Sequence, residues 1–428
     1  MHDPRVSAMA GGLIGSEILR IAADVRAMLA EGAEVCNLTV GDFSPAEFPA
    51  PAALVDGIVA ALRAGETNYP PSDGVLPLRQ AISRFYESWL GLSYPVDSIL
   101  VTGGSRPGLY ATYRALVDEG DTVVYPVPSW NNNHYVHLTA ARGVPVVCEA
   151  ADAFLPTREA LEPHVRGARL LVLNSPLNPS GTAFSADALA GICDLVLEEN
   201  ARRGTRERPL FLLYDQVYWM LTFGSTRHVD PVSLRPEMRD YTVFVDGISK
   251  CFASTGVRVG WTVAPVDITR RMASIVGHVG AWAPRAEQIA VAKLLDDRAA
   301  IEAYHATMLG EVSDRLDALY LGIEGLRERG YPVEAVRPMG AIYLSTRFEL
   351  HGAVTPQGKT LATNDDIRLY LLEAAGVAVV PFQAFGLKEE TGWFRLSVGA
   401  VSREEIAAAL QRLEGALSAV APATSTAV

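Results

Sequence analysis

Lys250 lies in the stretch YTVFVDGISKCFASTGVRVGWTVA, residues 241–264, between a strand-like apolar run and a Gly-rich turn. Ser249 precedes it, and Arg258 follows eight residues later. A hydroxyl and a guanidinium at these positions could bind the oxygens of one phosphate, because the donor fork of arginine matches phosphate geometry. Most lysines of globular proteins are solvated surface charges. The significance of Lys250 therefore depends on the groups that the rest of the chain brings to it.

A second candidate site for an anion follows the apolar run near residue 100. The stretch TGGSRPGLYATYRAL, residues 102–116, is typical of a Gly-rich turn that enters a helix. After Gly104, the backbone N–H groups of Ser105 and Arg106 would point at an anion, and the helix dipole would strengthen the attraction. The turn is a candidate phosphate site, although an ordinary helix cap would give the same pattern.

Other strand-like runs end in an amide-rich turn and a carboxylate. The turn NSPLNPSG, residues 174–181, holds two Asn, two Pro and a Gly, which favour an irregular conformation. Asp215 follows four apolar or aromatic residues in FLLYDQVYW. An unpaired carboxylate at a buried strand end is costly, so Asp215 requires a cation such as a protonated pyridine nitrogen, unless it caps a helix. Together with Trp130 and Tyr218, these groups suit one flat, heteroaromatic, phosphorylated ligand.

Composition narrows the class of protein and ligand. The chain has 428 residues, of which 49% are hydrophobic and 20% are charged, and these values are typical of a globular protein with a large core. Its formal net charge of -12 argues against a general affinity for nucleic acid and favours small-molecule ligands. The cysteines have neither disulfide-framework nor zinc spacing, and we expect them to be reduced thiols. Without a secretory or membrane-spanning segment, we expect a cytoplasmic protein with no metal.

The order of the apolar runs predicts the fold class. From about residue 98, seven short β-rich runs alternate with helical stretches, which is typical of an α/β protein with a mainly parallel seven-stranded sheet flanked by helices. Ligands of such sheets bind at the carboxyl ends of the strands. After residue 299, helices and strands predict a second, smaller α+β domain.

The same pattern predicts the domain boundaries. We expect an N-terminal segment at 1–50 that contributes to the small domain, a large domain at 51–298, a small domain at 299–420 and a flexible tail at 421–428. Within the first segment, a helix should end at Gly32, and residues 41–51 should form a loop.

Four motifs together carry a family resemblance. They are, in order, NSPLNPSG, YDQVY, SKCFASTGVRVGW and FRLSVG. This set resembles the pyridoxal-phosphate-dependent aminotransferases of fold type I, class I/II, and is most similar to the aspartate and aromatic enzymes, from about Gly41 to Gly399. The resemblance implies pyridoxal 5'-phosphate as cofactor and a homodimer with shared active sites. It also implies ping-pong transfer of an amino group from an amino acid to a 2-oxo acid such as 2-oxoglutarate.

The resemblance assigns roles around the cofactor. Lys250 matches the lysine that forms the internal aldimine and then shuttles a proton at the substrate α-carbon. Arg258 and Ser249 match phosphate-binding residues. Asp215 matches the carboxylate that keeps the pyridine nitrogen protonated, so that the ring can accept electrons. Tyr218 matches a donor to the ring 3'-oxygen, as does Asn178.

The resemblance also assigns residues to the substrate and to a second subunit. Arg395, in FRLSVG, matches the arginine that binds the substrate α-carboxylate, and Gly41 matches a glycine whose backbone lies close to that carboxylate. Trp130 matches the aromatic residue that stacks on the cofactor, although a tryptophan of the core is the alternative. Tyr69 matches a tyrosine that reaches the phosphate from the neighbouring subunit.

Several positions depart from the family pattern. Arg106 stands where one branch of aspartate aminotransferases has a lysine, and Ser105 where it has a glycine, so Arg106 could meet a side-chain carboxylate, the phosphate or solvent. Another branch takes a distal-carboxylate arginine from the partner subunit, and the sequence leaves open whether Arg285 corresponds to it. The polar cluster Asn131 to His134 could assist the substrate or cofactor through Asn133, or could be structural. We expect aspartate first among the amino donors; a carbon–sulfur β-lyase or related synthase is the alternative, and a non-enzymatic regulatory module is a third.

Overall fold

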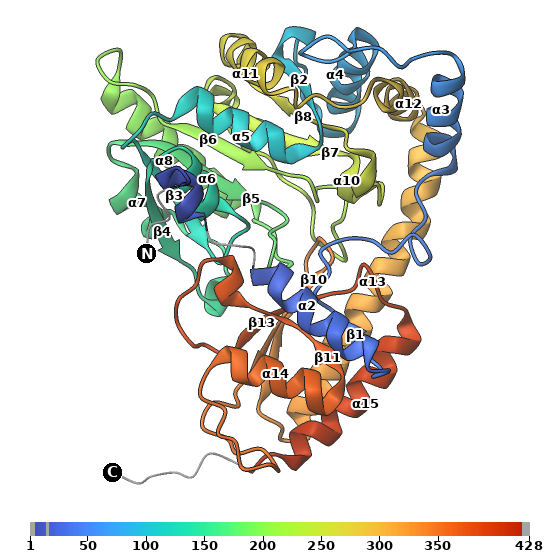
Figure 1. Ribbon diagram of the computed structural model, residues 1–428. Coiled ribbons are helices and arrows are strands. Elements are labelled where there is room, and N and C mark those ends of the chain that lie inside the picture. The colour runs from blue at the N-terminus through green and yellow to red at the C-terminus, as the bar shows by residue number, and fades with distance from the viewer. Residues whose placement is uncertain (1–4, 14–16, 422–428) are drawn as a thin grey trace.

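The seven β-rich runs form one sheet in the computed structural model, which describes residues 5–13 and 17–421 (Figure 1). Strand β8 runs antiparallel to both of its neighbours, β2 and β7, and the four remaining pairings are parallel. The predicted α/β class with a mainly parallel sheet is confirmed. The spatial order of the strands is β2 (Ile99–Thr102), β8 (Gly260–Val263), β7 (Thr242–Gly247), β6 (Phe211–Asp215), β5 (Ala168–Asn174), β3 (Thr122–Val127) and β4 (Arg142–Val147).

Alternate residues of these strands enter two apolar clusters on opposite faces of the sheet. Leu212 and Phe244 belong to one cluster, whereas Leu213 and Val243 belong to the other. Burial on both faces explains why the strands are continuous apolar runs in the sequence. The helices on this sheet are α3 (Ala52–Arg63), α4 (Leu76–Leu90), α5 (Ser105–Leu116), α6 (Asn132–Leu138), α7 (Arg158–Val165), α8 (Ala186–Arg203), α9 (Pro231–Leu234), α10 (Ile248–Cys251), α11 (Val266–Val279) and α12 (Arg285–Asp296). Short 3-10 turns join them at Val96–Ser98, Ala150–Asp152, Pro236–Asp240 and Thr255–Val257.

A long helix, α13 (Arg298–Glu328), leads into a second sheet in the lower half of Figure 1. That sheet has four antiparallel strands in the order β12 (Val380–Pro381), β13 (Trp393–Ser397), β10 (Tyr343–Phe348) and β9 (Val333–Val336). Helices α14 (Asn364–Ala375) and α15 (Arg403–Ala419) and the turn Phe382–Phe385 complete this α+β part. Strand β9 was not predicted, because it is a half-buried edge of only four residues.

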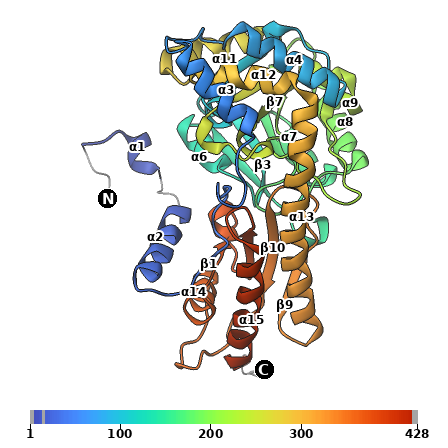
Figure 2. The same cartoon turned by 90° about the vertical axis from the view of Figure 1, so that its right-hand side faces the viewer.

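The N-terminal segment touches both parts of the molecule: α1 (Ala8–Gly12) contacts α6 of the first part, and Met9 O lies 2.7 Å from His137 Nε2, whereas the following elements pack on the second part. Helix α1 and helix α2 (Glu17–Ala30) lie to one side of the molecule in Figure 2. Strand β1 (Cys36–Asn37) then pairs in parallel with β11 (Val377–Ala378). Beyond it, residues 41–51 contain neither helix nor strand, as expected, and Ser44 N donates to Gly399 O at 2.8 Å. This loop therefore reaches the space between the two sheets from the second one.

Ala421 forms an isolated bridge with Val354, so the expected flexible tail does not begin at this residue, and residues 422–428 lie outside the described residues. Within residues 5–13 and 17–421, no helix has both the length and the apolar character needed to cross a bilayer.

Candidate active site

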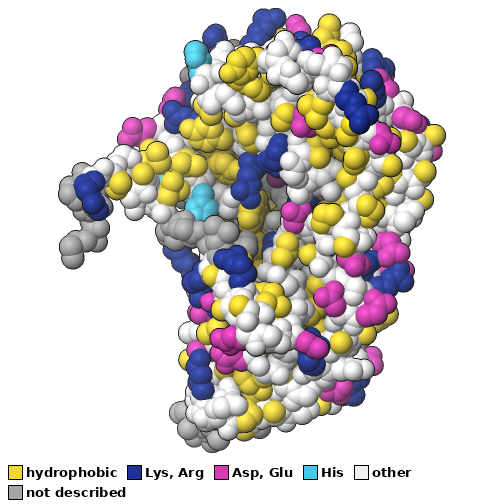
Figure 3. All heavy atoms as spheres, turned by 45° about the vertical axis from the view of Figure 1, so that its right-hand side comes forward, with side chains coloured by type: hydrophobic (Ala, Val, Ile, Leu, Met, Phe, Trp, Pro, Cys, Tyr) yellow, Lys and Arg dark blue, Asp and Glu magenta, His cyan; other side chains and the backbone are white. Residues whose placement is uncertain are grey.

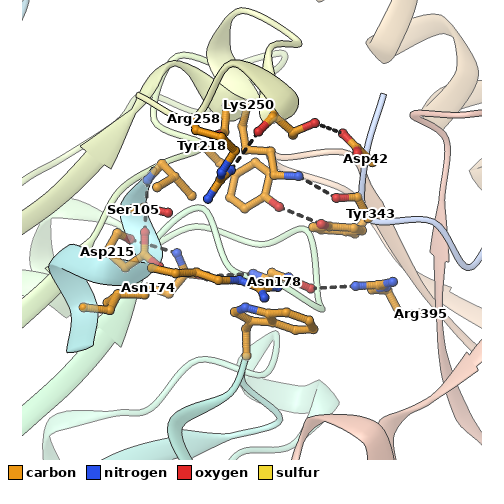
Figure 4. A pocket seen from close by; sticks show the side chains of 17 residues that line it. Asp42, Ser105, Asn174, Asn178, Asp215, Tyr218, Lys250, Arg258, Tyr343 and Arg395 are labelled. Atoms are coloured by element: carbon orange, nitrogen blue, oxygen red, sulfur yellow. Dashed lines mark hydrogen bonds between the residues drawn. The ribbon is translucent and has the colours of Figure 1, made fainter. Parts of the chain in front are cut away.

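A cavity of about 390 Å³ lies at the carboxyl ends of the parallel strands. In Figure 3 the surface is hollowed between the two parts of the molecule, and Lys and Arg side chains gather at the hollow. Eleven of the thirteen predicted site residues line the cavity; the exceptions are Gly104 and Tyr69. The eleven are Gly41, Ser105, Arg106, Trp130, Asn178, Asp215, Tyr218, Ser249, Lys250, Arg258 and Arg395. Figure 4 shows how these side chains converge from strands and loops that are far apart in the sequence.

Lys250 lies on α10, a single helical turn that directly follows β7. Its Nζ donates a hydrogen bond to the carbonyl oxygen of Gly41 at 2.5 Å. Burial lowers the pKa of Lys250 to about 8; the carboxylate of Asp42 opposes this shift, and the nearby arginines reinforce it. Near neutral pH a substantial fraction of this amine is therefore neutral, and a neutral amine is a nucleophile.

The Gly-rich turn brings the N-terminus of α5 close to the guanidinium of Arg258. Gly104 has φ 86°, and a Cβ atom at this residue would collide with the guanidinium of Arg258. That guanidinium donates to Gly103 O at 3.0 Å and to Thr255 O at 2.7 Å. Two backbone carbonyls thus fix the cation beside the first turn of the helix. Gly104 is needed for this approach even though it does not line the cavity.

Asp215 ends β6 without a cationic partner. Its carboxylate accepts a hydrogen bond from Val217 N at 3.2 Å, and burial raises its pKa to about 7. No Lys, Arg or His of residues 5–13 and 17–421 forms an ion pair with it, whereas its neighbour Asn174 uses the side-chain amide to hold the backbone of Asp215 and of Asn178 at 2.8 Å each. The prediction that Asp215 needs a cation from a ligand fits this geometry, and the alternative of a helix N-cap does not, because no helix begins here.

Arg395 places a buried guanidinium on the opposite wall of the cavity. It is 1% exposed and donates to Asn178 Oδ1 at 3.1 Å and to Thr39 O at 2.6 Å. Its Nε has no hydrogen-bond partner among the described residues. Burial lowers the pKa of Arg395, so an anion in the cavity would stabilise its charge.

Two tyrosines link the walls of the cavity. The hydroxyls of Tyr218 and Tyr343 are 2.6 Å apart, and burial raises the pKa of both groups. Tyr343 begins β10 in the second sheet, whereas Tyr218 follows β6 in the first. The hydrogen bond therefore joins the two parts of the molecule at the cavity.

Trp130 forms part of the cavity wall and is not a core residue. Its ring is partly buried and lies 6.3 Å from that of Phe385, centroid to centroid. The guanidinium carbon of Arg106 lies 5.3 Å from the centroid of the Trp130 ring. Arg106 is exposed, so its head group remains free to meet an anion that enters the cavity.

Tyr69 and Arg285 lie at a second hollow, away from the Lys250 cavity. Tyr69 is 82% exposed and packs edge-on against Trp282. Arg285 is engaged by Glu66, with Nε 2.5 Å from the carboxylate. Within this chain, neither residue reaches the cavity that contains Lys250.

The polar cluster after Trp130 has a structural role in the described chain. None of residues 131–134 lines the cavity, and Asn133 is exposed. The side chain of Asn132 is buried and donates to Ser129 Oγ at 2.9 Å. Burial lowers the pKa of His134, which favours a neutral ring. The suggestion that Asn133 assists a ligand has no support in this geometry.

Sequence reasoning missed four polar residues that line the cavity: Asp42, Asn174, Thr255 and Tyr343. Three of them had a local signal. Asp42 follows the predicted Gly41, Asn174 opens the amide-rich turn, and Thr255 lies between Lys250 and Arg258. Tyr343 gave no such signal, because it reaches the cavity from the second sheet.

The chain matches one family of known proteins over most of its length. A family model described as aminotransferase class I and II matches residues 33–413. An aspartate aminotransferase of Rhizobium meliloti (strain 1021) is 32% identical over 404 residues, which cover 94% of this chain and 93% of that protein. One from Geobacillus stearothermophilus is 28% identical, with 96% and 98% covered.

Solved structures agree with the sequence matches. The aspartate aminotransferase from Rhizobium meliloti superposes with a TM-score of 0.88 at 30% identity, covering 97% of this chain and 99% of that chain. The enzyme from Thermus thermophilus with maleate gives a TM-score of 0.85 at 26% identity, with 96% and 99% covered. These matches do not favour the β-lyase alternative. The chain belongs to the class I and II aminotransferases and is a pyridoxal-phosphate-dependent transaminase.

Proposed function

We propose that this transaminase moves the amino group of a dicarboxylic amino acid, aspartate first, to a 2-oxo acid such as 2-oxoglutarate. One observation supports the proposal most strongly. A single cavity holds a buried amine of lowered pKa, a carboxylate without a cation and a guanidinium without an anion, which are Lys250, Asp215 and Arg395. These unmet charges match a cationic heteroaromatic ring and an amino-acid carboxylate.

The chain's own residues fit the cofactor, which supplies an electron sink when bound. Ser105, Ser249, Arg258 and the first turn of α5 would hold its phosphate, and Asp215 would hold the proton of its ring nitrogen. The remaining contacts fall to the aromatic and amide groups of the cavity. Trp130 would stack on the ring, and Tyr218 would donate to the ring oxygen. Since Asn178 Oδ1 already accepts from Arg395, its amide N–H groups are left to donate to the same oxygen.

The substrate's α-carboxylate would bind Arg395. Its guanidinium lines the cavity and is fixed by two hydrogen bonds, so a carboxylate meets a preorganised cation. Gly41 keeps this space open, because a Cβ atom there would lie 3.0 Å from the hydroxyl of Tyr343 and 3.5 Å from Nη1 of Arg395. Lys250 would then hold and move the proton at the substrate α-carbon.

Arg106 would bind the distal carboxylate. Of the four cations that line the cavity, Arg106 remains after Arg258 is assigned to phosphate, Arg395 to the α-carboxylate and Lys250 to the chemistry. Its head group is exposed over Trp130, where an entering side chain would meet it. The names of the relatives, aspartate aminotransferase in Rhizobium and Geobacillus, agree with a dicarboxylic substrate.

A half-reaction screen tests the substrate proposal. Holoenzyme is mixed with each standard amino acid, and the change in cofactor absorbance is followed by stopped flow. We expect the fastest response with aspartate and glutamate. Arg106→Ala should lower the second-order rate for these two by about 10- to 100-fold, because a hydrogen bond to a charged group is worth about 1.5–3 kcal/mol. It should change the rate for alanine or phenylalanine less than about 3-fold. An equal loss for every amino acid would make Arg106 a cofactor residue and refute its proposed role.

We also propose that the protein is a homodimer and is located in the cytoplasm. Its domain boundaries are proposed near residues 51 and 298. The phenol of Tyr69 is exposed and lies away from its own cavity, and it would reach the phosphate bound by a second subunit. Leu62, an exposed apolar side chain, lines the same hollow as Tyr69. Sedimentation equilibrium should give about twice the chain mass of 46.0 kDa. A monomer that retains full activity would contradict the shared site.

A further inference from the structure

Asp42 is the charged residue of the cavity that the proposed function leaves without a role. Two carboxylates line this cavity, and Asp215 is assigned to the ring nitrogen. Asp42 lies beside Lys250 in Figure 4, on the loop that enters from the second sheet. The four cations of the cavity stabilise this carboxylate, but it weakens their attraction for a dicarboxylate. A substrate group that meets Asp42 should therefore carry positive charge.

The carboxylate of Asp42 is held by one of its two oxygens. Oδ1 accepts the hydroxyl of Thr255 at 2.6 Å and the backbone N–H of Phe43 at 2.8 Å. Among the described residues, no hydrogen bond ends on Oδ2. The residue is only partly buried, so this second oxygen is available to the contents of the cavity. Asp42 is therefore fixed in position and still has free acceptor capacity.

The neighbours of Asp42 place this free oxygen where a substrate nitrogen would arrive. The preceding carbonyl, that of Gly41, accepts from Nζ of Lys250 at 2.5 Å. On its other side, Gly41 lies against the guanidinium of Arg395, which a Cβ atom would approach to 3.5 Å. An amino acid whose carboxylate binds Arg395 and whose nitrogen approaches Lys250 must therefore pass Asp42.

We propose that Asp42 binds the α-ammonium group of the amino donor while Arg395 binds its α-carboxylate. The two ends of the zwitterion are then held by opposite charges on either side of Gly41. No proton is transferred in this contact; the ammonium donates a hydrogen bond to Oδ2. The inference rests on the proposed function. It goes beyond that function because it predicts that Asp42 strengthens the binding of the amino donor but not that of the 2-oxo acid, which has no ammonium group.

The test separates the two half-reactions in Asp42→Asn, which keeps the shape of the side chain and removes its charge. We expect the half-saturating concentration of the amino donor to rise roughly 10-fold, from the loss of one charge-assisted hydrogen bond. The half-saturating concentration of the 2-oxo acid should change less than about 2-fold. Asp42→Glu, which keeps the charge, should recover part of the donor affinity. An equal change for donor and oxo acid, or no change for either, would overturn the proposal.

Thr255→Val is the matched control, because it removes the hydroxyl that holds Asp42 and leaves the carboxylate charged. Its effect on the donor should be clearly smaller than that of Asp42→Asn. A control variant that reproduces the whole effect would make Asp42 a residue that merely fixes the loop. The proposed function fails separately, if wild-type holoenzyme transfers no amino group at all. Should Asp42→Asn not fold, Asp42→Ser takes its place, because it also removes the charge. A rise for the donor alone, absent from Thr255→Val, is again the expected result, and an equal change for donor and 2-oxo acid would overturn the proposal.

Discussion

Two carboxylates, the partly buried Asp215 and the fully buried Asp246, stand close together at the ends of β6 and β7 and differ in their hydrogen bonds. Asp215 pairs across the two strands with Val245, the residue before Asp246. Asp215 accepts one hydrogen bond from the protein, at 3.2 Å from Val217 N, and lines the cavity. Asp246 is 0% exposed and lies off the cavity. It accepts three hydrogen bonds: from Tyr86 Oη at 3.1 Å, Trp219 Nε1 at 3.0 Å and Gly247 N at 2.7 Å.

The hydrogen bonds of Tyr86 show that Asp246 accepts a hydrogen bond from the tyrosine hydroxyl and does not donate one to it. Tyr86 Oη accepts from Gln216 Nε2 at 3.2 Å and from Trp261 Nε1 at 3.3 Å, so its own proton goes to Asp246. Burial raises the pKa of Asp246 to about 8, and the hydrogen bonds from its donors oppose that shift. The comparison teaches that a buried carboxylate surrounded by donors holds strands together, whereas one with a single donor at a cavity wall is a ligand-binding group.

The largest expected effect is a difference in kcat between variants of Asp215 and of Asp246. Asp215→Asn should lower kcat by about 100- to 1000-fold, because the amide cannot hold the proton of the ring nitrogen electrostatically. Asp246→Asn should retain kcat within about 5-fold in the fraction that folds. Steady-state rates at saturating cofactor measure both. Similar losses in the two variants would remove the distinction between the carboxylates.

The stability of the apoprotein should show the reverse order. Asp246→Ala leaves the buried donors of Tyr86 and Trp219 without an acceptor, so we expect a loss of roughly 3–4 kcal/mol, at about 1–3 kcal/mol for each donor. Asp215→Ala should change the free energy of unfolding by less than about 1 kcal/mol, since the one backbone donor that loses its acceptor can donate to water in the cavity instead. Urea unfolding of the two apoproteins tests this, and a larger loss in Asp215→Ala would contradict it.

The smallest effect is a pH dependence carried by Asp215 in the apoprotein. Its pKa is raised from 3.8 to about 7, so the folded state keeps a proton that the unfolded state releases between these values. Wild-type apoprotein should therefore lose stability relative to Asp215→Asn as pH rises from 5 to 8, by roughly 1–2 kcal/mol after allowance for water in the cavity. Asp246 is present in both proteins, so its contribution to the pH dependence cancels in the difference. A difference that stays constant with pH would show that Asp215 is already ionised in the empty site.

The fold and much of the site were predictable from the sequence for a physical reason. Strands buried on both faces are continuous apolar runs, and the carboxyl ends of parallel strands share one edge, so Asp215, Asn178 and Lys250 could be placed together before the structure was known. What remained hidden depends on contacts between distant segments. Tyr343 enters the cavity from another sheet, and Asp246 meets Tyr86 across 160 residues of chain. Local patterns carry no information about such pairs.

Covalent trapping of the cofactor tests the central claim most directly. Holoenzyme is reduced with borohydride, digested and analysed by peptide mass spectrometry, with Lys250→Ala as the control. A single peptide that carries the reduced cofactor on position 250, absent from the control, is the predicted result. Cofactor bound without any reducible link, a link to a different lysine, or a control that transfers amino groups at the wild-type rate would contradict the assignment of this cavity.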